Sequence, residues 1–128
     1  MYTVKEAADM LGVNPHTIRY YTNQNLTPHL SRDKNGVRLF NDTDIEYLQV
    51  TIYLRNCGMP IQQIREYFSL AEKGDSTIKE RYHMLLLQQE RLNEQQQQLT
   101  QSQKFISHKL KMYSEYLYEN ENITKETE

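Results

Sequence analysis

Cysteine is almost absent from this chain of 128 residues, and long apolar runs are missing altogether. The single cysteine, Cys57, cannot form an internal disulfide, and no apolar stretch approaches the ~20 residues that a membrane-spanning helix requires. The N-terminus lacks the basic and then apolar segments of a secretion signal. We therefore expect a cytoplasmic protein with no role in a membrane.

Hydrophobic residues are also scarce, at 38% of the chain. A typical globular protein has roughly 45–50%. This share is too small to fill the core of one compact domain of 128 residues. It suits a small domain that carries an exposed amphipathic helix. The length excludes a function that needs two large folded lobes.

Catalytic and metal-binding patterns are absent as well. The histidines are scattered, and no set of His, Cys and Asp and no pair of carboxylates forms a recognisable motif. The histidines are His16, His29, His83 and His108. We expect no enzyme activity, no metal site and no cofactor.

Charge is nearly balanced over the whole chain, with a net value of −2, so it does not by itself indicate a nucleic-acid partner. Basic residues are nevertheless concentrated between positions 16 and 38, where Asp33 is the one acidic residue. The basic residues there are Arg19, Arg32, Lys34 and Arg38. The segment from Ala71 onward has eight basic and ten acidic residues, so any DNA contact is expected in the N-terminal part.

The first residues predict two short helices separated by a turn. Thr3 and Glu6 form a capping-box pattern before an apolar stretch, and Gly12 allows the positive φ that ends a helix. Asn14 and Pro15 then supply an N-cap and a first helical residue that needs no amide hydrogen. Two short helices around a glycine-containing turn are typical of a helix-turn-helix, although an ordinary helical hairpin fits the same pattern.

The second of these helices, from about residue 15 to 24, has an apolar and a polar face. Ile18 and Tyr21 share the inner face. The outer face consists of His16, Thr17, Arg19, Tyr20 and Asn23. It is either a solvated surface or a recognition surface on which Arg19 and Tyr20 reach phosphates or base edges in the major groove.

A small β-hairpin is expected next. Residues 30–32 and 37–40 are compatible with strands, and Asn35-Gly36 between them is a strong hairpin signal. Together, the second helix and this wing contain the predicted DNA-binding residues. These are His16, Thr17, Arg19, Tyr20, Arg32, Lys34, Asn35 and Arg38.

Two further helices complete the predicted N-terminal domain, which we place at residues 1–74. The third helix begins after an N-cap at Asn41 or Asp42 and ends at Gly58. Its expected inward residues are Ile45, Leu48, Ile52 and either Tyr53 or Leu54. The fourth helix begins at Pro60, and its expected buried stripe is Ile61, Ile64, Tyr67 and Phe68. A break at residues 73–76 ends the domain and supplies a new N-cap.

Residues 77–118 contain neither glycine nor proline and carry an uninterrupted seven-residue repeat of apolar positions. We assign residues 75–119 to one helix and residues 120–128 to a polar, disordered tail. A helix of ~60 Å cannot bury its apolar stripe against a domain of about 70 residues, so a partner chain is required. The predicted dimerisation residues are Ile78, Tyr82, Leu85, Leu92, Leu99, Ile106, Leu110, Tyr113 and Leu117.

The middle of this repeat is partly polar, because Gln89, Gln96 and Gln103 occupy repeat positions. Two antiparallel copies centred near Gln96 pair Gln89 of one copy with Gln103 of the other, and a parallel pair also satisfies the pattern. A low-complexity spacer over residues 88–103 is the other interpretation.

Five short runs occur in order along residues 2–59. They are Tyr2-Thr3-Val4-Lys5-Glu6-Ala7-Ala8, Leu11-Gly12-Val13, Thr17-Ile18-Arg19-Tyr20-Tyr21, Gly36-Val37-Arg38-Leu39-Phe40 and Leu54-Arg55-Asn56-Cys57-Gly58-Met59. With the long helix that follows, these runs resemble the MerR family of bacterial transcription regulators. The resemblance implies a mainly α fold, in which a winged helix-turn-helix head precedes a long helix that forms an antiparallel coiled coil in a homodimer. It also implies a near-palindromic promoter element in double-stranded DNA, distortion of the DNA between its half-sites, and RNA polymerase as a partner at the promoter.

The chain departs from the family pattern at several positions. Thr22 stands where relatives commonly have Glu, Asn25 where they have Gly, and Val37 where they have Tyr. Metal-sensing relatives carry cysteines at the start of the long helix and in a loop after it, whereas this chain has Asp75-Ser76 and no cysteine beyond Cys57. Drug-sensing relatives add a large C-terminal domain, whereas about ten residues follow Tyr118 here, too few for a pocket of their own. The effector is therefore unknown.

Cys57 and Tyr53 are the candidate effector or redox residues. Some short relatives sense electrophiles or aldehydes through a cysteine that aligns with Tyr53, which implies a stress response. Cys57 lies one helical turn later, either as a sensor or as a small apolar filler.

Two further alternatives stay open. Four tyrosines either pack with their hydroxyls in water or line an effector pocket between the head and the long helix. They are Tyr53, Tyr67, Tyr82 and Tyr113. The alternative function is a coiled-coil adaptor that binds another protein without sequence-specific DNA binding.

Overall fold

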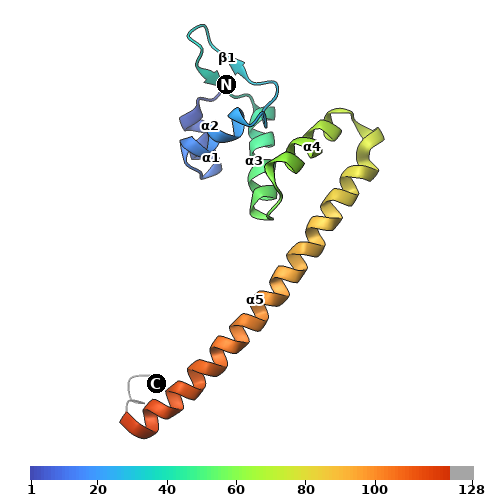
Figure 1. Cartoon of the computed structure of the whole chain (residues 1–128). Helices are drawn as coiled ribbons and strands as arrows, with labels where there is room; N and C mark the ends of the chain where they lie inside the picture. The colour runs from blue at the N-terminus through green and yellow to red at the C-terminus, as the bar shows by residue number, and fades with distance from the viewer. Residues whose placement is uncertain (122–128) are drawn as a thin grey trace. The chain divides into compact units, whose positions relative to one another are not determined.

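The computed structural model describes residues 1–121 and contains a small two-stranded sheet among helices (Figure 1). The order is α1 (Val4–Leu11), α2 (Pro15–Asn23), β1 (Ser31–Arg32), β2 (Arg38–Leu39), α3 (Asp42–Asn56), α4 (Ile61–Glu72), the 3-10 helix η1 (Asp75–Thr77) and α5 (Ile78–Glu121). This order confirms the expected mainly α fold with a winged helix-turn-helix and a long C-terminal helix.

The chain divides into two compact units, Met1–Gln88 and Gln89–Glu128. The first unit includes the beginning of α5, so it is longer than the domain of residues 1–74 inferred from sequence. Of the tail expected at residues 120–128, residues 120 and 121 complete α5, and the rest lies outside the described residues.

The helix-turn-helix is built from the caps that its sequence predicts. The Thr3 hydroxyl accepts a hydrogen bond from the Glu6 amide at 3.2 Å, and the Glu6 carboxylate accepts one from the Thr3 amide at 2.9 Å. Gly12 ends α1 with φ 68°, a left-handed conformation that glycine adopts without steric cost. The Asn14 side chain then accepts a hydrogen bond from the His16 amide at 2.8 Å, with Pro15 as the first residue of α2.

The hairpin pairs Ser31 with Leu39 and Arg32 with Arg38 in antiparallel register. Its turn depends on Asp33, whose carboxylate accepts hydrogen bonds from the Asn35 amide at 2.8 Å and the Val37 amide at 2.9 Å. Among the residues that the structure describes, the positive φ of this turn falls on Gly36 and not on Asn35. The hairpin was therefore predicted correctly, but an Asx-type turn with one left-handed glycine forms it.

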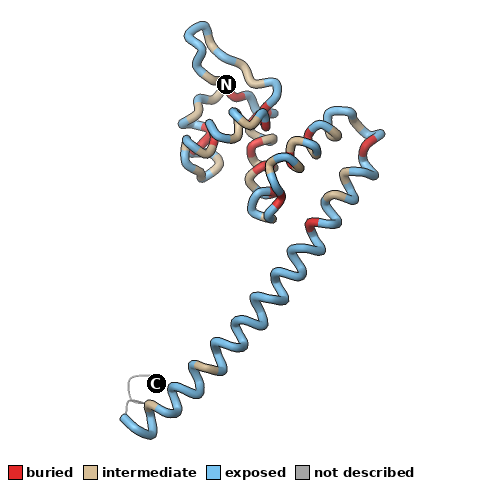
Figure 2. The backbone as a smooth tube through the Cα atoms, in the orientation of Figure 1, coloured by how far each residue is buried: buried red, intermediate tan, exposed pale blue. Residues whose placement is uncertain are grey.

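The buried residues of the first unit, red in Figure 2, form two clusters. One joins the helix-turn-helix to the wing and α3 through Ala7, Ala8, Ile18, Phe40 and Leu48. The other joins α3 and α4 to the segment after α2 through Leu26, Leu54, Met59, Ile64 and Phe68. Tyr21 of α2 packs against both clusters, so the second helix is held from two sides.

The α3 helix selects between the two alternatives left open for its inward face, Tyr53 and Leu54. Leu48 and Leu54 are buried, whereas Tyr53 has 63% of its surface exposed, so Leu54 is the inward residue of that pair. Asp44 and Thr51 are buried as well, which the apolar pattern did not predict. Asp44 is satisfied because its carboxylate accepts a hydrogen bond from the Asn41 amide at 3.0 Å, and the Thr51 hydroxyl donates to the Tyr47 carbonyl at 2.8 Å.

The α4 to α5 junction also differs from expectation. No side-chain cap forms at η1, so the predicted N-cap in the 73–76 break is absent. The chain instead enters α5 through the 3-10 turn, with the buried Thr77 hydroxyl 2.5 Å from the Leu70 carbonyl and 2.9 Å from the Gly74 carbonyl. These contacts tie the 3-10 turn to the Leu70 carbonyl of α4 and to the Gly74 carbonyl in the connection between the helices.

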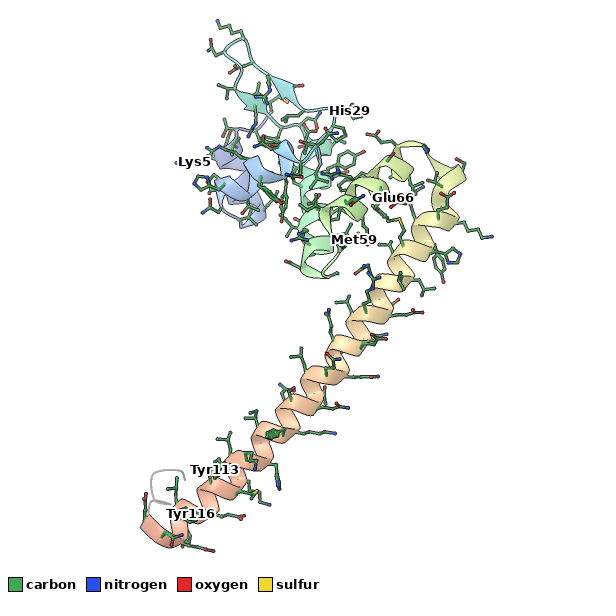
Figure 3. The ribbon with its side chains drawn as sticks, in the orientation of Figure 1. Lys5, His29, Met59, Glu66, Tyr113 and Tyr116 are labelled. Carbon is green, nitrogen blue, oxygen red and sulfur yellow. The ribbon has the colours of Figure 1, made fainter. Side chains whose placement is uncertain are left out.

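The α5 helix is 44 residues long, which corresponds to ~66 Å at 1.5 Å per residue. Along residues 89–121 most of its surface is exposed (Figure 2), including Leu99 at 67% and Leu110 at 63%. Tyr113 and Tyr116 project from the helix in the same way (Figure 3). Leu117 is half-buried, and the other predicted dimerisation residues are exposed in the single chain.

Candidate nucleic-acid interface

The α2 helix presents a polar surface opposite its buried residue. Ile18 is fully buried, whereas the neighbouring Arg19 and Tyr20 are exposed, Tyr20 at 51%. His16 and Asn23 are exposed too, and Thr17 is half-buried. The side chains expected to face outward are thus accessible in four of five positions.

An open hollow of ≈ 450 Å³ lies where α1, α2 and the wing meet. Its walls include one basic residue from α1, one from α2 and two from the hairpin, which are Lys5, Arg19, Arg32 and Arg38. Thr3, Val4, Gly36 and Val37 complete the lining. Three segments that are distant in sequence therefore contribute cationic side chains to one concave surface.

Arg38 has the most constrained position in this cluster. Its guanidinium donates a hydrogen bond to the Asn23 side-chain oxygen at 2.6 Å, which ties β2 to the end of α2. Burial lowers the pKa of Arg38, and the positive charges of Arg32 and Arg19 lower it further. These like charges repel one another, and an anion in the hollow would relieve that repulsion.

Arg32 is oriented by the wing itself. Its guanidinium donates a hydrogen bond to the Gly36 carbonyl at 3.0 Å, so the side chain folds toward the turn of the hairpin. The remaining guanidinium hydrogens stay available, because the side chain has five N–H donors and this bond uses one. A planar donor group of this kind matches the oxygens of a phosphate.

The hollow contains three of the eight predicted DNA-binding residues, Arg19, Arg32 and Arg38. The other five do not line it: His16, Thr17, Tyr20, Lys34 and Asn35. Lys34 and Asn35 are exposed in the turn of the wing. Sequence reasoning missed Lys5, which Figure 3 labels on α1. The available signal was its place in the first turn of α1, two residues after the Thr3 cap.

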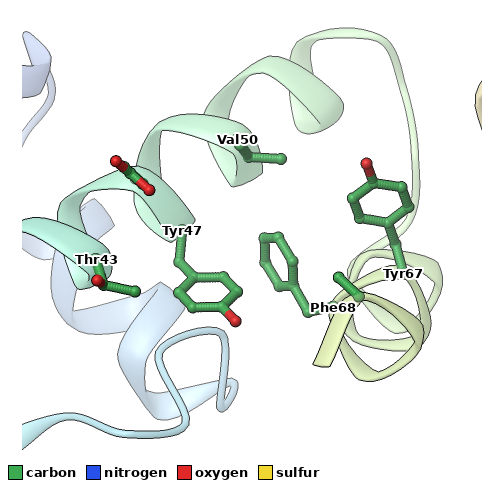
Figure 4. A pocket seen from close by; sticks show the side chains of 7 residues that line it. Thr43, Tyr47, Val50, Tyr67 and Phe68 are labelled. Atoms are coloured by element: carbon green, nitrogen blue, oxygen red, sulfur yellow. The ribbon is translucent and has the colours of Figure 1, made fainter. Parts of the chain in front are cut away.

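A second hollow, of ≈ 250 Å³, lies between α3 and α4 and is lined by aromatic rings (Figure 4). The rings of Tyr47 and Phe68 pack edge to face at 4.7 Å between centroids, and Tyr67 lies beside Phe68. Burial raises the pKa of Tyr47, with smaller contributions from Glu72 and Asp44.

The residues that line this hollow differ from the four tyrosines for which the sequence left an effector pocket open. Of the four tyrosines proposed for it, Tyr67 lines this hollow, whereas Tyr53 and Tyr82 are exposed. Tyr113 belongs to the second unit, outside this hollow. Tyr47, which the sequence argument did not select, takes the central place.

Cys57, the candidate sensor, is the half-buried residue that ends α3. Its amide donates a hydrogen bond to the Tyr53 carbonyl at 3.1 Å, so the two residues lie one helical turn apart as expected. Among residues 1–121, no group of three or more His, Cys, Asp and Glu side chains could hold a metal ion. No helix in that range has the length and apolar character to cross a membrane.

Comparison with known proteins agrees with this geometry. The family described as "MerR HTH family regulatory protein" matches residues 2–71, and the family described as "MerR, DNA binding" matches residues 45–108. An uncharacterised HTH-type transcriptional regulator of Haemophilus influenzae is 31% identical over 112 residues, which cover 88% of this chain and 83% of that protein.

Two solved structures are similar to most of the chain. A MerR family transcriptional regulator from Bacillus thuringiensis has a TM-score of 0.78 and 35% identity, covering 88% of this chain and 98% of its own. HiNmlR, described as a MerR family regulator lacking the sensor domain and bound to promoter DNA, has a TM-score of 0.77 and 31% identity. That match covers 89% of this chain and 90% of the HiNmlR chain.

The fold and the basic surface define a winged helix-turn-helix protein of the kind that regulates transcription by binding DNA. The chain belongs to the MerR family of transcription regulators.

Proposed function

We propose that this regulator acts as a homodimer on a near-palindromic promoter element and distorts the DNA between the two half-sites. RNA polymerase at that promoter is the partner on which the distortion acts, and the protein works in the cytoplasm without catalysing a reaction itself. The relatives and families that match the chain are transcription regulators, and the similar HiNmlR protein was solved bound to promoter DNA.

The observation that carries the proposal is the convergence of Lys5, Arg19, Arg32 and Arg38 on one concave surface. A DNA backbone supplies closely spaced phosphates, which suit a cluster of cationic donors. The α2 face next to this cluster offers the exposed His16 and Tyr20 and the half-buried Thr17 to base edges in the major groove, and Lys34 and Asn35 extend the wing toward the backbone. In this arrangement the hollow fixes the register of α2 on the duplex.

The second copy is required by α5. Its repeat positions, among them Leu99 and Leu110, are exposed along a helix of 44 residues, and a stripe of that length is stable in water when a partner helix covers it. An antiparallel pair centred near Gln96 places the two heads at opposite ends of the coiled coil, which suits two half-sites.

The test is a binding selection with the full chain on random duplex DNA, followed by salt titrations on the enriched sequence. We expect an enriched inverted repeat. The Arg19→Ala substitution should cost about 1–3 kcal/mol per half-site and reduce the salt slope by about one, because it removes a cationic donor from the hollow that binds phosphate. The Lys34→Ala substitution should weaken binding to all sequences alike and reduce the salt slope by about one, because Lys34 contacts phosphate.

Glu66→Ala is a control, since Glu66 is exposed on α4 and does not line the hollow. A wild-type chain that enriches no sequence would favour the coiled-coil adaptor instead. An Arg19→Ala variant with unchanged operator affinity at physiological salt would remove Arg19 from the interface.

A further inference from the structure

The end of α2 is held by a residue from a distant helix. Arg65 of α4 donates from one guanidinium nitrogen to the Gln24 backbone carbonyl and to the Gln24 side-chain oxygen, both at 3.1 Å. Gln24 is the C-cap of α2, where the last carbonyls of a helix have no partner within the helix and carry partial negative charge. A cation that binds there satisfies the carbonyl and fixes the position of the helix end.

Two further contacts link α4 to the segment that follows α2. Leu26 is fully buried and packs in one cluster with Ile64 and Phe68 of α4. His29 lies 2.9 Å from the Glu72 carboxylate, farther along the same helix. Packing and a polar contact therefore reinforce the Arg65 anchor, and all three act on residues 24–29.

The C-terminal end of α4 is also connected to the first turns of α5. Arg81 of α5 donates to the Thr77 hydroxyl at 3.1 Å and to the Gly74 carbonyl at 2.9 Å. The Thr77 hydroxyl is in turn within hydrogen-bonding distance of the Leu70 carbonyl at the end of α4. The α4 helix is therefore linked to the C-cap of α2 through Arg65, and to α5 through Thr77, which Arg81 contacts, all within the first compact unit.

We infer that Arg65 is a positioning residue for DNA reading, which sets the orientation of α2 through Gln24 and transmits to it the orientation of α4 and the start of α5. Arg65 is half-buried and does not line the basic hollow, so the role inferred for it requires no contact with phosphate. This inference rests on the proposed function, because it concerns how the same α2 face is presented to its operator.

The test compares Arg65→Met with Arg55→Met in the full chain. Methionine keeps an unbranched apolar stem and removes the donors. Arg55 is a matched control, because its guanidinium nitrogen donates to the Met59 carbonyl at the same distance of 3.1 Å but makes no bond to α2. The probes are the duplex enriched by the wild-type chain and a scrambled duplex of the same length. Thermal melts establish a temperature at which every variant is fully folded.

We expect Arg65→Met to bind the enriched duplex about tenfold more weakly or worse, since a hydrogen bond to a charged group is lost at the helix that reads the bases. Binding to the scrambled duplex should stay within about twofold, with an unchanged salt slope, because no phosphate contact is removed. Arg65→Lys should fall between the two, because its ammonium group can still donate to the Gln24 carbonyl. Arg55→Met should preserve the ratio of the two affinities.

Three results would overturn the inference. A folded Arg65→Met variant that binds both duplexes like the wild type would leave Arg65 with a role in stability alone. A parallel loss on both duplexes with a shallower salt slope would make it a phosphate contact. An equal loss of discrimination in Arg55→Met would show that either arginine matters only through its charge. If the wild-type chain enriches no sequence, the proposed function itself fails and the inference fails with it.

Discussion

Asn25 keeps a left-handed backbone conformation at a position where glycine is expected. The resemblance to the MerR family implies glycine at this position, and Asn25 adopts a left-handed φ of 62° directly after Gln24, the C-cap of α2. The Leu26 amide donates to the Tyr21 carbonyl at 3.1 Å and the Asn25 amide to the Thr22 carbonyl at 3.0 Å, which is the hydrogen-bond pattern of a Schellman motif. Asparagine tolerates this conformation better than other residues with a Cβ atom, so the α2 terminus keeps its geometry.

We expect Asn25→Ala to lower the free energy of unfolding by about 1 kcal/mol, because alanine is strained at positive φ. Asn25→Gly should change it by less than about 0.5 kcal/mol, since relief of the remaining strain is offset by the larger entropy of the unfolded chain. Urea denaturation followed by circular dichroism measures both values. Gln62→Ala, at an exposed position of α4, is the control for an ordinary helical site. Equal stability of the alanine and glycine variants would contradict the strain argument.

Cys57 is the other residue whose role depends on its local surroundings. The thiol is half-buried at the end of α3, and the neighbouring Gly58 has φ 88°, so the helix ends there whatever the side chain at 57 does. The structure thus gives Cys57 a place at the helix end without assigning it a chemical role.

We expect Cys57→Ala and Cys57→Ser to keep the wild-type response of a promoter reporter to formaldehyde, methylglyoxal and a quinone. A half-buried cysteine behaves as a small hydrophobic residue unless its surroundings activate the thiolate. Both variants should also retain operator affinity, which gel-shift titration checks and which controls for folding. Loss of induction in both variants, with operator binding intact, would identify Cys57 as a sensor.

At the scale of elements, local capping chemistry made the head predictable from sequence. Thr3 with Glu6, Gly12, and Asn14 with Pro15 each specify a helix end through bonds to residues within a few positions, and all formed as expected. Such contacts can be inferred because both partners lie in the same short stretch of sequence. The hairpin was predictable from its local sequence as well. The sequence did not predict that the Asp33 carboxylate accepts the hydrogen bonds of its turn.

Long-range contacts account for most of what the sequence did not predict. The Lys5 contribution to the basic hollow and the Arg65 bond to Gln24 connect residues from separate helices, and the latter pair is 41 positions apart. The periodicity of apolar residues does not predict such contacts between helices, because in the sequence Lys5 and Arg65 each have the pattern of an exposed charged residue on a helix. The sequence left the choice between Tyr53 and Leu54 open for a related reason, since the apolar stripe of α3 fits either adjacent position and tertiary packing selects Leu54.

At the scale of the whole molecule, the seven-residue repeat and the exposed apolar stripe of α5 both indicate that a second helix covers this stripe. A helix of 44 residues with large apolar side chains exposed along it gains little from its own packing, and in proteins most helical stability comes from burial of an apolar face. The glutamines at 89, 96 and 103 weaken the centre of the stripe, and polar residues at such positions specify register at some cost in stability. Dimerisation should therefore depend strongly on the few central leucines.

We expect the purified chain to be a dimer by sedimentation equilibrium and Leu92→Lys to be largely monomeric at the same concentration. A lysine at position 92 places a charge in the stripe between two glutamine positions, where little other apolar surface offsets its desolvation. In the monomer each half-site binds one head without the help of the other. The loss of operator affinity should therefore be larger than the loss caused by removing any single DNA contact. Gln95→Lys, at an exposed position outside the repeat, is the matched control and should stay dimeric. A Leu92→Lys chain that remains a dimer with wild-type operator affinity would exclude this stripe as the interface.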